Sequence, residues 1–94
     1  KQSLSASNIL PPVSDLRIHA AAAGRLVVQM RSRTSGSIQL RVVDLLGRKL
    51  IERPVELHKG SSGKAEIEFP YQKGIYLLQL QGAGWATTER FQWP

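Results

Sequence analysis

The chain has 94 residues, 41% of them hydrophobic, which is enough for one domain with a modest core. It contains no cysteine, so disulfides and cysteine-based metal or catalytic sites are excluded. Thirteen lysines and arginines against seven aspartates and glutamates give a net charge of +6, spread along the chain without long runs. A solvated basic surface explains this balance, and an acidic partner is the alternative.

Residues 1–12 are predicted to be a linker, because they are polar, rich in serine and end in Pro11-Pro12. Proline has a fixed φ and no amide donor, so the first strand is expected to begin only after this pair. The chain begins at Lys1 rather than Met, and we expect it to be the end of a longer protein whose last domain is residues 13–94. No apolar run approaches the roughly 20 residues of a membrane helix.

From Val13 onward apolar residues recur at every second position, which is the period of a β-strand. The strands are expected at Leu16–Ala20, Arg25–Arg31, Ile38–Val43, Lys49–Val55, Lys64–Phe69, Ile75–Leu80 and Trp85–Trp93. Because Ile75–Leu80 is apolar on both faces, it is predicted to be a central strand, whereas Pro54 indicates an edge strand or a strand end. Glycine-rich turns separate the strands. The pattern predicts an all-β fold, an antiparallel Ig-like β-sandwich of about seven strands.

Two turns carry local signals. In Asp44-Leu45-Leu46-Gly47-Arg48, the aspartate can accept a backbone N–H and Gly47 supplies the positive φ that lets the next strand begin. Gly74 permits a sharp turn, after which the hydroxyl of Tyr76 can reach upstream backbone, as in a tyrosine corner. An ordinary half-buried aromatic is the alternative for Tyr76. Structural roles are sufficient to explain both turns.

The residues offer no catalytic, cofactor or metal site. His19 and His58 have no second ligand at metal spacing. The segment Gly60–Lys64 lacks the spacer and the final Ser/Thr of a phosphate-binding P-loop. Glu66 and Glu68 share a solvent-facing side, whereas glycosidase carboxylates line a cleft. We therefore expect a protein that is not an enzyme.

Trp85, Phe91 and Trp93 fall on one face of the last predicted strand. Closing one end of a sandwich core is the simpler interpretation of these side chains. The alternative is a ligand platform that includes Trp85 and Trp93, and this would indicate a carbohydrate-binding or adhesin module. A nucleic-acid partner is not expected.

The order of the pieces suggests a family. A proline-containing segment, Ile9–Ile18, leads into the first strand, Asp44–Arg48 follows a middle strand, Gly74–Tyr76 opens a later one, and Thr88–Gln92 lies in the last. In this order they resemble the type A C-terminal sorting domain of the type IX secretion system of Bacteroidetes-type bacteria.

The resemblance implies a signal rather than a catalyst. It implies recognition by the type IX translocon, transit through the periplasm, export across the outer membrane, and then release or attachment at the cell surface by the sortase and attachment complex. The signal residues that it implies are Asp44, Gly47, Arg48, Gly74, Tyr76, Arg90 and Phe91.

Two departures from the family pattern support an alternative. Pro11-Pro12 stands where Asn-Pro is usual, and Arg90 stands where lysine is usual, with Trp93-Pro94 beyond it. These departures favour an uncleaved variant that is retained on a component of the secretion or attachment machinery and binds partner proteins or anionic lipopolysaccharide. Dimerisation through an open strand edge is a further alternative that no residue pattern favours.

Overall fold

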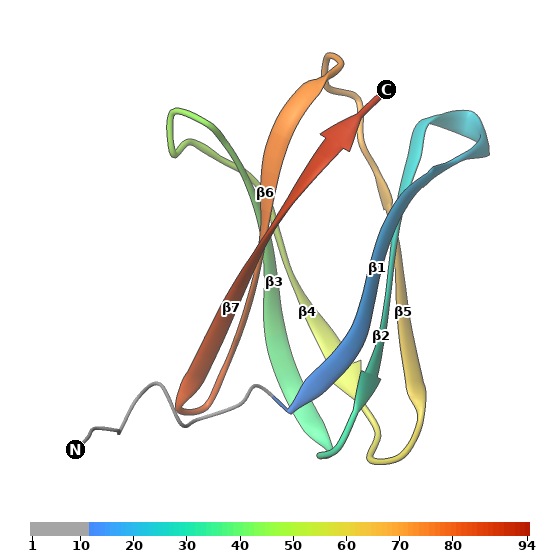
Figure 1. The fold of residues 1–94 in the computed structure, drawn as a ribbon, viewed down its shortest axis with the longest axis vertical. Coiled ribbons are helices and arrows are strands. Elements are labelled where there is room, and N and C mark those ends of the chain that lie inside the picture. Colours follow the sequence, from blue (N-terminus) through green and yellow to red (C-terminus); the bar gives the residue numbers. More distant parts are fainter. Residues whose placement is uncertain (1–11) are drawn as a thin grey trace.

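The computed structural model describes residues 12–94, which form two facing β-sheets (Figure 1). The elements are β1 (Val13–Ala21), the 3-10 turn η2 (Ala22–Gly24), β2 (Arg25–Ser32), β3 (Gly36–Asp44), β4 (Lys49–Leu57), β5 (Ser62–Glu68), β6 (Gly74–Gly82) and β7 (Trp85–Trp93). The predicted linker lies outside the described residues except for Pro12.

One sheet has the strand order β1-β2-β5 and the other β4-β3-β6-β7, and every neighbouring pair is antiparallel. Two pairs, β2 with β5 and β3 with β6, join strands that are not consecutive, as in immunoglobulin-type sandwiches. The predicted antiparallel β-sandwich is therefore confirmed. So are the central position of β6 and the edge position of β4, the strand that carries Pro54.

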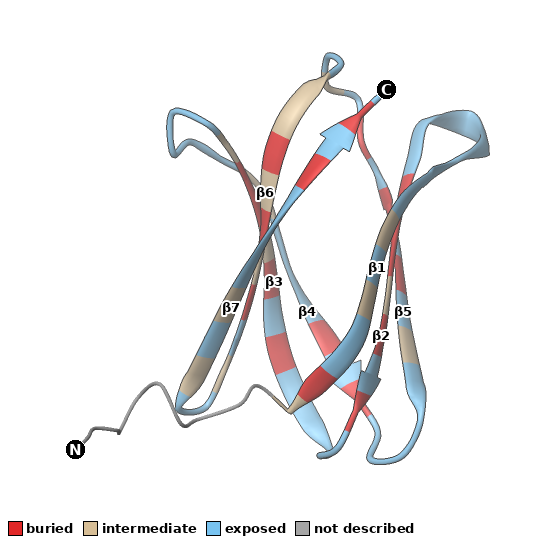
Figure 2. Ribbon diagram, viewed as in Figure 1, coloured by how far each residue is buried: buried red, intermediate tan, exposed pale blue. Residues whose placement is uncertain are grey.

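The core lies between the sheets and follows the alternation seen in the sequence (Figure 2). Each strand from β2 to β6 contributes every second side chain to it, which removes apolar area from water. The most buried side chains are Leu26, Val28, Met30, Leu40, Val42, Leu57, Leu78 and Leu80. The apolar residues at every second position of the predicted strands that begin at Arg25, Ile38 and Lys64 are all buried.

A β-bulge in β1 was not foreseen. Ser14 lies opposite Arg31, but the register then shifts so that Arg17, rather than Leu16, lies opposite Gln29. The extra residue is Asp15, whose φ of 53° is uncommon for a residue other than glycine. Without the bulge, Leu16 would lie opposite Gln29 and face solvent. The bulge instead lets Leu16 pack against the core.

Arg53 closes one open side of the sandwich. It lies opposite Leu40, so it projects from the inner face of the edge strand β4. Its Nη1 donates a hydrogen bond of 3.3 Å to the carbonyl oxygen of Glu66 in β5, the edge strand of the other sheet. An inward-pointing charge on an edge strand is one of the devices that prevent pairing with another chain.

Candidate recognition surface

The turn between β3 and β4 is held by the carboxylate of Asp44. Its Oδ1 accepts the backbone N–H groups of Leu46 and Arg48, both at 2.9 Å, and its Oδ2 accepts Nε of Arg48 at 2.7 Å. The amide of Gly47 donates to the carbonyl of Asp44 at 3.0 Å, and Gly47 has the expected positive φ of 86°. The hydrogen bonds that the carboxylate of Asp44 accepts, that from the Arg48 amide first, lower its pKa. The predicted structural role of this turn is confirmed.

The start of β6 is fixed by Tyr76. Its Oη donates a hydrogen bond of 2.5 Å to the carbonyl oxygen of Gln72, four residues upstream, which is the bond that the sequence predicted. The side chain is 8% exposed, so its hydroxyl is satisfied by protein rather than by water. Gly74, with a φ of 158°, begins the strand two residues earlier.

The sheet register brings the separate sequence motifs together. Asp44 lies directly opposite Tyr76, and Tyr76 lies directly opposite Phe91, so one row crosses β3, β6 and β7. Gly74 lies opposite Trp93 in the same end of the sheet. The residues implied by the family resemblance therefore occupy one end of the four-stranded sheet, although they are far apart in the sequence.

An aromatic cluster supports this end from inside. Phe69 is its centre: the ring centroids of Tyr71, Tyr76, Phe91 and Trp93 lie 4.9, 5.0, 6.0 and 4.7 Å from that of Phe69. Edge-on and tilted contacts of this kind add to the stabilisation from burial alone. Phe91 and Trp93 thus act within the core. Sequence reasoning placed Phe69 at the end of a strand but missed its central position in this cluster, and it missed Tyr71.

Two leucines stand exposed at the tip of the same turn. Leu45 is 64% exposed and Leu46 is 80% exposed, and they are the exposed large hydrophobic residues of the described chain. Arg48 and Lys49 follow them with side chains 72% and 55% exposed. Because Asp44 fixes the turn, this is a rigid apolar projection with basic flanks. Sequence reasoning missed it, although leucines at the centre of a turn, where polar residues are usual, are a signal.

The last strand offers a free edge. Within residues 12–94 the edge strand β1 carries the Asp15 bulge, β4 carries Pro54, and β5 has a carbonyl occupied by Arg53. The edge strand β7 has neither a proline nor a bulge, and it pairs with β6 without interruption from Trp85 to Trp93. A regular, unprotected edge presents a row of N–H and C=O groups to a partner strand.

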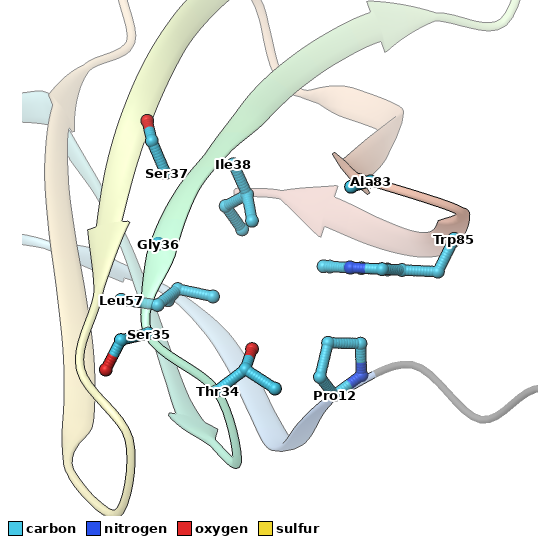
Figure 3. A pocket seen from close by; sticks show the side chains of 9 residues that line it. All are labelled: Pro12, Thr34, Ser35, Gly36, Ser37, Ile38, Leu57, Ala83 and Trp85. Atoms are coloured by element: carbon cyan, nitrogen blue, oxygen red, sulfur yellow. The ribbon is translucent and has the colours of Figure 1, made fainter.

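Trp85 lies at the opposite end of β7 from Trp93. It walls a pocket of about 260 Å³ together with Pro12, Ile38 and Leu57. The hydroxyl of Thr34 points into this pocket, whereas that of Ser35 points away from it and accepts the backbone N–H of Lys59 at 3.0 Å (Figure 3). Trp93 is buried in the core at 8% exposure. The two tryptophans are therefore not parts of one ligand platform.

Trp85 is also fixed by a close approach to the backbone. Its indole covers Gly82, its cross-strand partner, so closely that a Cβ atom at residue 82 would lie 2.3 Å from the indole Nε1. A glycine is required at this position for that packing.

The described residues hold no group of three or more histidine, aspartate or glutamate side chains arranged for a metal ion. In the same part of the chain, no helix is both long and apolar enough to cross a membrane.

Comparison with known proteins yields no relative: no protein-family model matches the chain, and no curated protein matches it.

Proposed function

We propose that this chain is a C-terminal sorting domain of the type IX secretion system, a folded signal for export across the outer membrane and for attachment at the cell surface. The observation that carries the proposal is the row formed by Asp44, Tyr76 and Phe91. Three motifs that resemble the family pattern in sequence order lie side by side at one end of one sheet. Tyr76 and Phe91 are buried, so the row acts from inside: it fixes the relative positions of the exposed turn after Asp44 and of the last strand, which a partner could read together.

Two features of this end suit recognition by the translocon and attachment proteins. The Leu45-Leu46 projection offers exposed apolar area on a fixed backbone, and fixed elements lose little entropy on binding. The free edge of β7 can pair with an extended segment of a partner, a mode in which main-chain hydrogen bonds supply affinity. Arg90 lies opposite Leu77, on the outer face of β7.

The first test is export of a reporter protein fused before the chain, in a bacterium with a type IX system. Deletion of residues 89–94 is expected to abolish export, because it removes half of β7. This deletion also removes Phe91 and Trp93 from the core, so a second variant is needed that leaves the core intact.

The second variant is L45S/L46S, which changes exposed side chains and leaves the Asp44 hydrogen bonds in place. We expect a purified domain with unchanged thermal unfolding and a reporter that accumulates in the periplasm. The matched control is A21S/A22S, which makes two exposed residues at the connection between β1 and β2 more polar and should export normally. Full export of both the deletion and L45S/L46S would refute the proposal.

An uncleaved variant on the secretion machinery is the second form of this proposal. It is favoured by the exposed leucines beside Arg48 and Lys49, since apolar area with basic flanks suits an anionic amphiphile such as lipopolysaccharide. The mass of the surface-exposed protein separates the two forms, because a cleaved cargo lacks residues 13–94 and a retained component keeps them.

A carbohydrate-binding or adhesin module is the competing function of another class. The pocket beside Trp85 favours it, because a partly exposed indole close to the Thr34 hydroxyl is suited to a sugar ring. This function predicts measurable sugar affinity in the isolated domain, lost in Trp85→Ala, and normal retention of a fused reporter inside the cell.

A further inference from the structure

The outer face of the three-stranded sheet carries a second feature that is separate from the recognition surface. It is a hollow of about 500 Å³, here called the basic hollow, and residues from β1, β2 and β5 line it. Its polar lining residues are Asp15, Arg17, Gln29, Arg31, Ser62 and Lys64.

The register brings three cations to this hollow. Arg17 and Lys64 lie on either side of Gln29 in one row across the sheet. Arg31 lies in the next row on the same face, between Ser14 and Ser62. Directly opposite residues have Cβ atoms about 5 Å apart, so all three side chains can reach one small anion placed over Gln29.

Two of these cations have no partner within residues 12–94. Arg17 and Arg31 make no side-chain hydrogen bond or ion pair with any residue in this described range. Lys64 Nζ lies 3.0 Å from Oε2 of Glu66, but that carboxylate also binds Arg25 at 3.2 Å. The hollow therefore gathers like charges with too few acids, an arrangement that a bound anion would relieve.

The bulge in β1 creates this arrangement. Because the register shifts at Asp15, Arg17 projects to the outer face opposite Gln29, whereas an unbroken register would place Leu16 there. Asp15 itself lines the hollow with a φ of 53°. Bulges re-aim side chains, and strained backbone of this kind is concentrated at functional sites.

We propose that the basic hollow binds a phosphate-type oxyanion on a hydroxyl-bearing carrier. Arg17 and Arg31 donate paired N–H groups to the oxyanion, and Lys64 adds a third charge. The carboxylate of Asp15 repels a bare anion but accepts a hydrogen bond from a neighbouring hydroxyl. The ligand class is therefore a sugar phosphate, free or in a larger glycan or headgroup. This site does not depend on the proposed sorting function.

The test is a titration of the ¹⁵N-labelled 94-residue chain, followed by amide chemical shifts at fixed ionic strength. Glucose 6-phosphate, inorganic phosphate and glucose are the probes. We expect saturable shifts centred on residues 29–31 and 62–64, with glucose 6-phosphate binding several-fold more tightly than inorganic phosphate and glucose not binding. Vesicles of phosphatidylcholine with phosphatidylglycerol form a further arm. Binding there without glucose 6-phosphate binding would assign the oxyanion to a lipid headgroup.

The decisive variant is R17Q/R31Q, which should weaken binding at least tenfold. Its matched control is K73Q/R90Q, which removes one charge from the loop before β6 and one from β7, away from the three-stranded sheet, and should bind the anion as the parent does. A cooperative thermal unfolding transition in each variant would establish that both variants fold. Equal losses in the two variants would mean that only net charge matters and would overturn the proposal, as would the absence of saturable shifts with every probe.

Discussion

At the scale of single residues, the hydroxyl of Tyr76 makes a partly buried hydrogen bond that can be removed without changing the ring. Tyr76→Phe keeps the contacts with Phe69 and Phe91 but leaves the carbonyl of Gln72 without its donor. We expect a loss of about 1 kcal/mol in the free energy of unfolding, measured by urea titration. Tyr71→Phe is the matched control, since its bond to Leu50 is less buried and should cost less. An unchanged midpoint for Tyr76→Phe would contradict this role.

Gly82 is a residue-scale requirement of a different kind. In Gly82→Ala the new methyl group collides with the indole of Trp85, so the indole must leave its site. Overpacking of this kind costs about 1–3 kcal/mol, and tryptophan fluorescence should shift to the red. In Gly63→Ala the methyl group would lie 3.5 Å from Leu57 Cδ2, an ordinary contact, so that variant should be as stable as the parent. Equal behaviour of the two variants would argue against a fixed indole.

At the scale of elements, Glu52 ties the edge strand β4 to its neighbour. Lys49 donates a hydrogen bond of 2.8 Å to the carboxylate of Glu52. Arg41, which lies opposite Glu52 in β3, donates a second one of 2.7 Å. These two cations, Lys49 first, lower the pKa of Glu52 from 4.5 to about 2. A lowered folded-state pKa stabilises the fold above the unfolded value, and this contribution is lost as the pH falls from about 4.5 to about 2.

The stability difference between the parent chain and Glu52→Gln should therefore be present at pH 6 and vanish near pH 2, as measured by urea midpoints. Glu56→Gln is the control on the same strand, because the Glu56 side chain has no bonding partner among residues 12–94. Its effect should be small at every pH. A Glu52→Gln difference that persists at pH 2 would show that the carboxylate acts through something other than its charge.

Sequence patterns at the element scale predicted most of the strands, because every second residue of a strand lies on the same face and shows by its polarity whether that face is buried. Pro54 indicated that its strand lies at the edge of a sheet, and the apolar residues on both faces of Ile75–Leu80 indicated a central strand. Both signals depend on what a strand contacts on its sides and faces. The bulge at Asp15 could not be predicted in this way, because it depends on how β1 aligns with β2. The grouping of Asp44 with Tyr76 is likewise a matter of register between strands distant in the sequence.

At the scale of the whole molecule, the sandwich measures 45 × 30 × 18 Å and its two sheets have different outer faces. The four-stranded sheet carries the turn held by Asp44 and the free edge of β7, and the three-stranded sheet carries the basic hollow. A translocon component and a phosphorylated ligand could therefore be bound at the same time. Export by L45S/L46S and anion binding by R17Q/R31Q should vary independently, since the two variants alter opposite sheets.

The path of the chain adds a consequence for anything joined to it. Pro12 lies by the Trp85 pocket, whereas Trp93 lies opposite Gly74, so the described chain enters at one end of the long axis and leaves at the other (Figure 1). The start of β1 and the turn between β3 and β4 therefore lie toward opposite ends of the sandwich, whereas the end of β7 lies at the same end as that turn. A tag added after Pro94 would thus extend from the end of the molecule that carries the exposed leucines.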